Sequence, residues 1–329
     1  MKTVCLLIVA LQFVYHVHSA CYWDKEAIVG VASDYPPAVA RYGLHELDLV
    51  FVAKDKYGNY GGQDVWFGWR ETGKTNINGP VVGGTTGFRS QAALTANAAH
   101  KLDLFYQGSN GHLWTIYHDA GPWWSEPIDL GGPHKRTDRA IAIKSAPAAT
   151  SGGPHKADVF YIGPNDHIWT TYWDEKTAWW TRGSEIGKQT ISGHLTAVTN
   201  GPHLVEVFYN VADQLWSIYS DDGLHWSAPN HFPTRINSNP SAVSSTTTTA
   251  KGGVVKTTRT AYVFLSDASN QLSAVISSDR GPWGVFSQGI KIGPQISAAS
   301  EDEVFFIGTP KSTDSAAGGV YRAFRYCAP

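Results

Sequence analysis

Residues 103–132 read DLFYQGSNGHLWTIYHDAGPWWSEPIDLGG, and the order of residue types in this stretch decides the fold class. Two short runs rich in aromatic and β-branched residues, DLFY and LWTIY, are separated by QGSNGH. Such runs on either side of an Asn-Gly turn are typical of a β-hairpin. A glycine-rich turn and Trp124 follow the second run, so the stretch predicts the hairpin and one further strand.

The same pattern occurs six times along the chain. A short apolar segment with a small residue precedes each hairpin, and these small residues are 45 to 58 positions apart: Ala38, Ala96, Ala148, Ala197, Ala242 and Ala298. The runs equivalent to DLFY end at Phe51, Tyr106, Tyr161, Tyr209, Leu265 and Phe306. The runs equivalent to LWTIY occupy 65–69, 113–117, 168–172, 215–219, 272–276 and 320–324. A tryptophan then follows in four of the repeats: Trp124, Trp180, Trp226 and Trp283.

Each repeat therefore contains four short strands in about 50 residues, which is typical of a β-propeller blade. Six repeats predict an all-β, six-bladed β-propeller with four-stranded blades. The alternative is a tandem of unrelated β-sandwiches, which leaves the matched positions unexplained.

The two ends of the chain complement each other. The sixth repeat has only three strands before Cys327, so its fourth strand is missing. The segment WDKEAIVG at 23–30 matches WSEPIDLG at 124–131, because both place an apolar residue and then Gly six and seven positions after the Trp. We therefore predict that the N-terminal strand completes the last blade and closes the ring. Residues 21–329 would then form one domain.

Residues 1–20 predict a secretory signal peptide. They contain one Lys, an apolar stretch from Val4 to Val14, and small residues at Ser19 and Ala20. A buried N-terminal strand and a lipoprotein signal ahead of Cys21 are the alternatives. No later stretch is long and apolar enough to cross a membrane, so the expected location is secreted and extracellular, without membrane insertion.

The chain contains three cysteines, and Cys5 would be removed with the signal peptide. The remaining two, Cys21 and Cys327, lie at the ends of the mature chain. In an oxidising compartment such a pair is expected to form a disulfide. The predicted ring brings both to one seam, where the bridge would contribute about 4–5 kcal/mol.

Composition excludes several function classes. The 329 residues carry 26 basic and 28 acidic side chains, and the formal charge of −2 argues against a nucleic-acid-binding protein. The sequence has no glycine-rich phosphate loop, no His-Glu-x-x-His motif, no cysteine pair with metal-ligand spacing and no nucleophile elbow. We therefore predict no catalytic residues, no cofactor and no metal site. The Ser/Thr-rich segment 244–260 is predicted to be a surface loop.

Aromatic residues supply the candidate binding sites. The repeated tryptophans at 124, 180, 226 and 283 are expected to pack between strands. Trp123 and Trp179 stand directly before two of them, and adjacent strand residues face opposite ways, so one of each pair should lie exposed or in a cleft between blades. A sugar can stack its C–H face on such an indole. The remaining candidates recur on the third strands: Trp114, Trp169, Trp216, His112, His167 and Gln214.

The repeat 103–132 and its partners resemble the blades of fucose-specific and related secreted β-propeller lectins, including tectonin-like lectins. The resemblance covers the whole mature chain and implies several sugar sites between neighbouring blades. Fucose-specific members present an Arg-Glu pair on the third strand. This chain reads LWTIY, IWTTY and LWSIY there, so the resemblance carries over the fold, the inter-blade location and the aromatic platforms, but not fucose.

Two other functions remain open. The segments 119–124 and 221–226 resemble the Asp-box turn of sialidases, so a glycan-cleaving enzyme, either a sialidase-like hydrolase or a polysaccharide lyase, is the main alternative. A protein-interaction scaffold is the other. We favour a non-catalytic lectin whose partners are glycans, because repeated weak sites gain avidity whereas an enzyme needs one elaborated centre. The oligomeric state is open.

Overall fold

The computed structural model describes residues 21–32, 35–41, 47–52, 65–71, 74–82, 90–98, 101–119, 124–130, 141–151, 157–174, 176, 178–191, 193–200, 204–251, 254–279, 281–308 and 319–327. All the secondary-structure elements in these ranges are β-strands, which confirms the all-β prediction. None of the described elements is a helix that could span a membrane. The proposed signal peptide and Trp123 lie outside the described residues.

The strands form six antiparallel sheets in the described part of the chain. The first sheet contains β2 (Ala38–Ala40), β3 (Leu47–Val52), β4 (Val65–Glu71) and β5 (Lys74–Val82). The second contains β6 (Ala93–Ala98), β7 (Lys101–Gln107), β8 (Leu113–Asp119) and β9 (Ile128–Asp129). The third contains β10 (Ala148–Thr150), β11 (Asp158–Ile162), β12 (Ile168–Asp174), β13 (Trp179–Trp180) and β14 (Ser184–Gly187).

The fourth sheet contains β15 (Leu195–Thr199), β16 (Val205–Val211), β17 (Gln214–Ser220) and β18 (Asn230–Arg235). The fifth contains β19 (Ser241–Lys251), β20 (Val254–Ser266), β21 (Gln271–Ser278) and β22 (Gly284–Lys291). The sixth contains β23 (Ile296–Ser300), β24 (Glu303–Ile307), β25 (Gly319–Cys327) and the N-terminal strand β1 (Cys21–Ala32). The third sheet differs from the predicted four strands because β13 and β14 both pair with β12.

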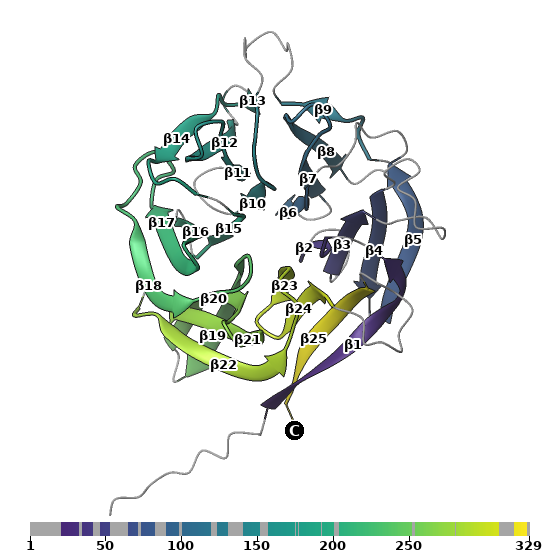
Figure 1. Ribbon diagram of the computed structural model, residues 1–329, viewed down its shortest axis with the longest axis vertical. Coiled ribbons are helices and arrows are strands. Elements are labelled where there is room, and N and C mark those ends of the chain that lie inside the picture. Colours follow the sequence, from purple (N-terminus) through teal and green to yellow (C-terminus); the bar gives the residue numbers. More distant parts are fainter. Residues whose placement is uncertain are drawn as a thin grey trace, which may run out of the picture.

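The sheets are arranged around a central axis, with the first strand of each nearest the centre (Figure 1). These innermost strands contact one another in the order β2, β6, β10, β15, β19 and β23, and β23 also contacts β2. The small residues that the sequence places in these strands allow this close approach.

The N-terminal strand pairs with the C-terminal one. Strand β1 lies antiparallel to β25, with Trp23 opposite Arg325 and Cys21 opposite Cys327. This places the first described residues at the outer edge of the sixth sheet, beside β25 (Figure 1). The structure describes the backbone of both cysteines but not their side chains, so the disulfide stays a prediction.

Neighbouring sheets are joined by tryptophan–phenylalanine pairs. In each pair an indole from one sheet meets a phenyl ring of the preceding sheet nearly at right angles, at centroid distances of 5.3 to 5.9 Å: Trp124 on Phe67, Trp180 on Phe105, Trp226 on Phe160, Trp283 on Phe208 and Trp23 on Phe264. Edge-to-face contacts of this kind add to the burial of apolar area. The structural role predicted for the repeated tryptophans is therefore confirmed, and Trp23 plays the same role in the N-terminal strand.

The register corrects the predicted alignment of the innermost strands. The residues opposite the equivalent second-strand position are Ala38, Ala93, Ala148, Thr196, Ser241 and Ser297. The alignment through Ala96, Ala197, Ala242 and Ala298 was therefore displaced by one to three residues. Several small residues follow one another in these strands, as in ALTANA and ISAAS, so their pattern does not define a single register.

The prediction of a surface loop at 244–260 is wrong. Strands β19 and β20 continue as one hairpin from the pair Ser241–Phe264 to the pair Lys251–Val254. The physical reason is that a run of Thr and Val favours extended strands.

Candidate functional site

A cleft of about 360 Å³ lies between the second and third sheets. Its volume is at the lower end of the range for ligand pockets, roughly 300–1,000 Å³. Side chains from both sheets line it, among them Lys101, Asp103, Tyr117, Asp119, Trp173, Trp179 and Trp180. The cleft thus has the inter-sheet location that the sequence predicted for a ligand site.

The wall from the third sheet is aromatic. Trp173 at the end of β12 pairs across the sheet with Trp180 in β13, and their rings meet edge-on at 5.8 Å. Trp179 is the preceding residue of β13, opposite Asp174. Both Trp179 and Trp180 are half-buried and both line the cleft. The third sheet therefore contributes three indoles to one cavity.

The wall from the second sheet is polar. The Lys101 ammonium at the start of β7 lies 2.7 Å from the Asp119 carboxylate at the end of β8. The Asp103 carboxylate accepts a hydrogen bond from the Asn97 side-chain amide. Tyr117 is 43% exposed, so its ring is accessible at the cleft. Hydrogen-bonding groups held on one side thus face indoles on the other.

The other predicted site residues of the second sheet form a cluster at the β7–β8 turn. The Trp114 indole N–H donates to Asn110 Oδ1 at 3.0 Å. His112 Nδ1 lies 2.9 Å from Asp129 Oδ2, and the Asn110 amide donates to the same oxygen at 3.1 Å. Asp129 also lines the cleft, so this cluster adjoins the candidate site.

The third sheet repeats this cluster with other residues. The Trp169 indole N–H donates to Asn165 Oδ1 at 2.8 Å, and His167 Nδ1 lies 3.0 Å from Glu185 Oε1. The hydrogen bond with His167 is the main cause that lowers the pKa of Glu185. In both sheets the indole packs closely on a turn glycine, since a Cβ at Gly108 or Gly163 would lie 2.5 Å from it. These contacts give Trp114 and Trp169 a structural role in closing the turn.

The fourth sheet departs from this arrangement. Ala212 occupies the position of Asn110 and Asn165, so no side-chain acceptor is available for the indole of Trp216. Its buried N–H accordingly has no hydrogen-bond partner among the described residues. The ring packs instead on His231 at 4.6 Å, and His231 Nε2 lies 2.9 Å from Gln214 Oε1.

One repeated feature was missed at the sequence level. The second strand of five sheets carries an acidic residue at the same position: Asp48, Asp103, Asp158, Glu206 and Glu303. All but Asp103 are buried. The signal was present as the first letter of DLVF, DLFY, DVFY, EVFY and EVFF. The repeated acidic residue bears on the candidate site because one member of the set, Asp103, lines the cleft.

The buried acids have different partners. Glu303 is bound by Arg322 Nε at 2.6 Å, and Arg41 Nη2 of the first sheet lies 3.8 Å from it. Among the described residues, Glu206 has the Ser217 hydroxyl as its partner, which donates to it at 2.8 Å. Burial without a cation raises the pKa of Glu206 to about 7.

Comparison with solved structures gives the fold a context. AofleA from Arthrobotrys oligospora superimposes with a TM-score of 0.61 over 93% of this chain and 88% of its own, at 15% identity. The BP39L lectin from Burkholderia pseudomallei has a TM-score of 0.56 over 90% and 96%, at 14% identity. The Aleuria aurantia lectin, described as a six-bladed β-propeller, has a TM-score of 0.54 over 76% and 77%, at 13% identity. The fold of this chain resembles that of the six-bladed β-propeller lectins.

At these identities the similarity concerns the fold. No family model matches the sequence, and no curated protein matches it either. The function therefore has to be argued from the cleft.

Proposed function

We propose that this chain is a carbohydrate-binding protein, a lectin without catalytic activity, which holds a sugar in the cleft between the second and third sheets. The observation that carries the proposal is the position of Trp179 beside Trp173 and Trp180, opposite the Lys101–Asp119 pair. A pyranose has apolar C–H faces and a polar rim. The indoles suit the faces, and the fixed charged groups suit the hydroxyls.

The similarity in fold supports the choice of carbohydrate. SapL1 lectin, at 14% identity and a TM-score of 0.58, was solved in complex with alpha methyl fucoside. The third strands of the second, third and fourth sheets lack the Arg-Glu pair expected of fucose-specific lectins, and an Arg-Glu pair occurs at the end of β4 in the first sheet, at Arg70 and Glu71. The proposal therefore names a sugar in the cleft between the second and third sheets and not fucose.

We also infer the finer architecture. The six sheets would be the blades of a closed propeller, in which β1 completes the last blade. The pairing of β1 with β25 and the contact between β23 and β2 support this inference. Secretion after removal of residues 1–20, and a bridge between Cys21 and Cys327, belong to the same proposal.

Multivalency is the remaining part of the proposal. The doubled tryptophans predict two strong sites, one at Trp179 and one at Trp123 in the preceding repeat. The fourth sheet carries His225 directly before Trp226, so a cleft between the third and fourth sheets would lack the second indole. We therefore expect weaker binding there.

A glycan array combined with a reducing-sugar assay tests the proposal. We expect binding of at least one glycan without turnover, and a loss of at least tenfold in affinity for the Trp179→Ala variant. Turnover of a bound glycan would overturn the non-catalytic assignment, and silence in both assays would favour a protein-interaction scaffold.

Two matched variants place the ligand. Tyr117 and Tyr219 occupy equivalent positions in the second and fourth sheets and are both 43% exposed, but only Tyr117 lines the cleft. We expect Tyr117→Ala to weaken binding and Tyr219→Ala to leave it unchanged. Equal effects of the two variants would contradict the location.

A further inference from the structure

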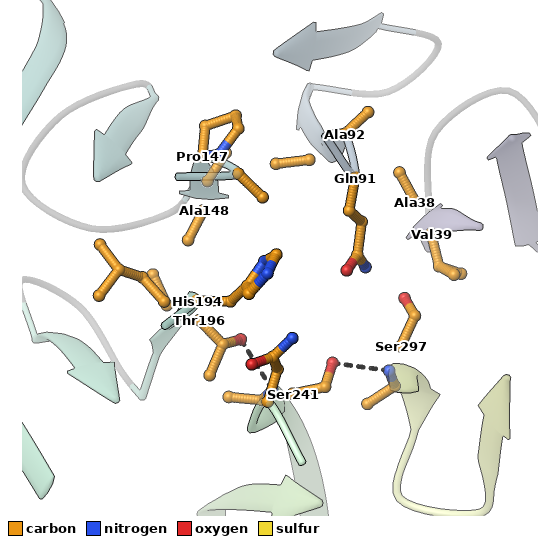
Figure 2. Close-up of a pocket in the computed structure, with 18 of the residues that line it drawn as sticks. Ala38, Val39, Gln91, Ala92, Pro147, Ala148, His194, Thr196, Ser241 and Ser297 are labelled. Atoms are coloured by element: carbon orange, nitrogen blue, oxygen red, sulfur yellow. Dashed lines mark hydrogen bonds between the residues drawn. The ribbon is translucent and has the colours of Figure 1, made fainter. Parts of the chain in front are cut away.

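The innermost strands enclose cavities along the central axis, and the two ends differ. At the narrow end a cavity of about 100 Å³ is lined by the starts of these strands. Figure 2 shows the Gln91 and His194 side chains reaching into it. Burial lowers the pKa of His194 below its ordinary value, so its imidazole is neutral at pH 7 and adds no charge.

At the wide end the cavity measures about 730 Å³ and is rich in hydroxyl groups. The Thr150 and Thr199 hydroxyls are 3.0 Å apart, and the Ser151 hydroxyl donates to the carbonyl of Ala96 at 2.6 Å. Ser244 and Ser300 line the same space. Hydroxyls from several sheets therefore surround a volume large enough for a monosaccharide.

Two arginines face this cavity from different sheets. Arg41 follows β2, and its buried Nε has no hydrogen-bond partner in the part of the chain that the structure describes. Its only ion pair in the described chain is the long 3.8 Å contact with Glu303, whose carboxylate Arg322 already holds at 2.6 Å. An unsatisfied buried donor on a cation is costly unless a ligand or water supplies an acceptor.

The second arginine belongs to the long hairpin of the fifth sheet. Arg259 in β20 lies opposite Thr246 in β19, and both residues line the cavity. No ion pair of the Arg259 guanidinium is present among the described residues. Lys256 lies three residues before Arg259 on the same strand and is exposed. Glu301 is the acidic residue of the lining, so the two arginines outweigh it.

We propose that the wide end of the central channel is a second ligand site, which binds a carboxylated monosaccharide such as a uronic acid. Arg41 and Arg259 meet the carboxylate, for which the guanidinium is geometrically suited. The Ser and Thr hydroxyls meet the sugar hydroxyls. This site is independent of the Trp179 cleft, where Asp103 and Asp119 face a single Lys101 and disfavour an anionic sugar.

Calorimetric titration of the whole protein with glucuronate, glucose and sulfate tests the proposal. We expect glucuronate to bind at least tenfold more tightly than glucose and than sulfate, and this binding to weaken as salt is added. Equal binding of glucose would overturn the role of the arginines. Equal binding of sulfate would show a general anion site and would overturn the sugar assignment. Absence of glucuronate binding would overturn the site itself.

Variants locate the binding. We expect Arg41→Gln to weaken glucuronate binding at least tenfold and Arg41→Lys to retain part of it. If Arg41→Gln does not fold, Arg259→Gln gives the same test on the other arginine of the cavity. Arg235→Gln removes the same charge from an exposed residue outside the channel and should have no effect. Unchanged binding in Arg259→Gln would overturn the assignment.

The Trp179→Ala variant separates the two sites. It should bind glucuronate with unchanged affinity while losing the glycan of the cleft. A loss of both in this variant would mean that the acidic sugar binds in the cleft, which would overturn the channel site without affecting the proposed lectin function.

Discussion

The five interfaces that contain a tryptophan–phenylalanine pair differ from the one between the sixth and first sheets. The outer strand of the first sheet, KTNINGPVV, has no tryptophan to place on Phe305 of the sixth. That interface instead contains an apolar cluster with Leu47, Leu49 and Phe305, together with the Arg41–Glu303 ion pair. A partly exposed ion pair contributes less than an edge-to-face aromatic contact with its buried area. The interface between the sixth and first sheets therefore relies on apolar packing and an ion pair, where the other five have an edge-to-face aromatic contact.

The largest expected effect concerns the proposed bridge between β1 and β25, which lies within the sixth sheet. We expect Cys327→Ser to lower the free energy of unfolding by about 4–5 kcal/mol, because the bridge would enclose nearly the whole mature chain. Denaturant unfolding under non-reducing conditions measures it. Thiol labelling of the unfolded, unreduced secreted protein should find no reactive cysteine. Two labelled cysteines would show that the bridge is absent.

The next effect concerns the tryptophan–phenylalanine interface between the third and fourth sheets. Trp226→Ala removes the indole that packs on Phe160, and we expect a loss of about 3 kcal/mol, as for other truncations of large aromatic side chains. Thermal unfolding measures the loss. Leu224→Ala is the control, since Leu224 is 65% exposed two residues earlier and should change little. Equal effects would contradict the assigned role of the tryptophan.

The burial of the Glu206 carboxyl group predicts that the stability of the protein depends on pH. Glu206 binds its proton more tightly in the folded protein, where burial raises its pKa from 4.5 to about 7. Its contribution to stability is therefore complete below pH 4.5 and is lost as the pH rises through 7, by at most about 3 kcal/mol.

The variant Glu206→Gln isolates this contribution. Relative to the wild type, it should be more stable at pH 8 than at pH 5. Denaturant unfolding at the two pH values measures the difference, with the exposed Glu126→Gln as control. A stability difference that does not change with pH would show that Glu206 titrates normally.

The smallest effect concerns a difference among the innermost strands, some of which carry Ser or Thr where others carry Ala. The Thr196 and Ser241 hydroxyls accept hydrogen bonds from the backbone N–H groups of Ala242 and Ala298 in the next sheets, whereas Ala38, Ala93 and Ala148 occupy the equivalent positions. We expect Ser241→Ala to cost about 1 kcal/mol. Ser269→Ala, at an exposed turn, serves as control. Unchanged stability in Ser241→Ala would show that the hydroxyl contributes nothing at this interface.

The sequence allowed prediction of the outer hairpins better than of the centre. Each second and third strand was found where predicted, because runs such as DVFY and IWTTY have distinct boundaries at Gly and Asn. The innermost strands were found, but their register was not, since Ala, Ser and Thr repeat within them. The extension of this hairpin over 244–260 was missed because the segment is rich in polar residues, and only the β-propensity of Thr indicated strands.

The candidate cleft was predictable from one side only. The pair Trp179–Trp180 is visible as a doubled tryptophan, and the structure places Trp179 at the cleft. The facing Lys101 and Asp119 belong to the preceding repeat, and only the packing of two sheets brings them opposite the indoles. Nothing in the local pattern distinguishes such residues from solvated surface charges. The roles of Trp114 and Trp169 in closing turns likewise required the positions of Asn110 and Asn165.

The most direct test of the lectin assignment is a crystal structure of the protein with a glycan selected from the array. We predict electron density for a sugar ring between the second and third sheets, stacked on the indole of Trp179 and hydrogen-bonded to Lys101 or Asp119. Density for the glycan only at other places, with this cleft empty at saturating concentration, would contradict the account.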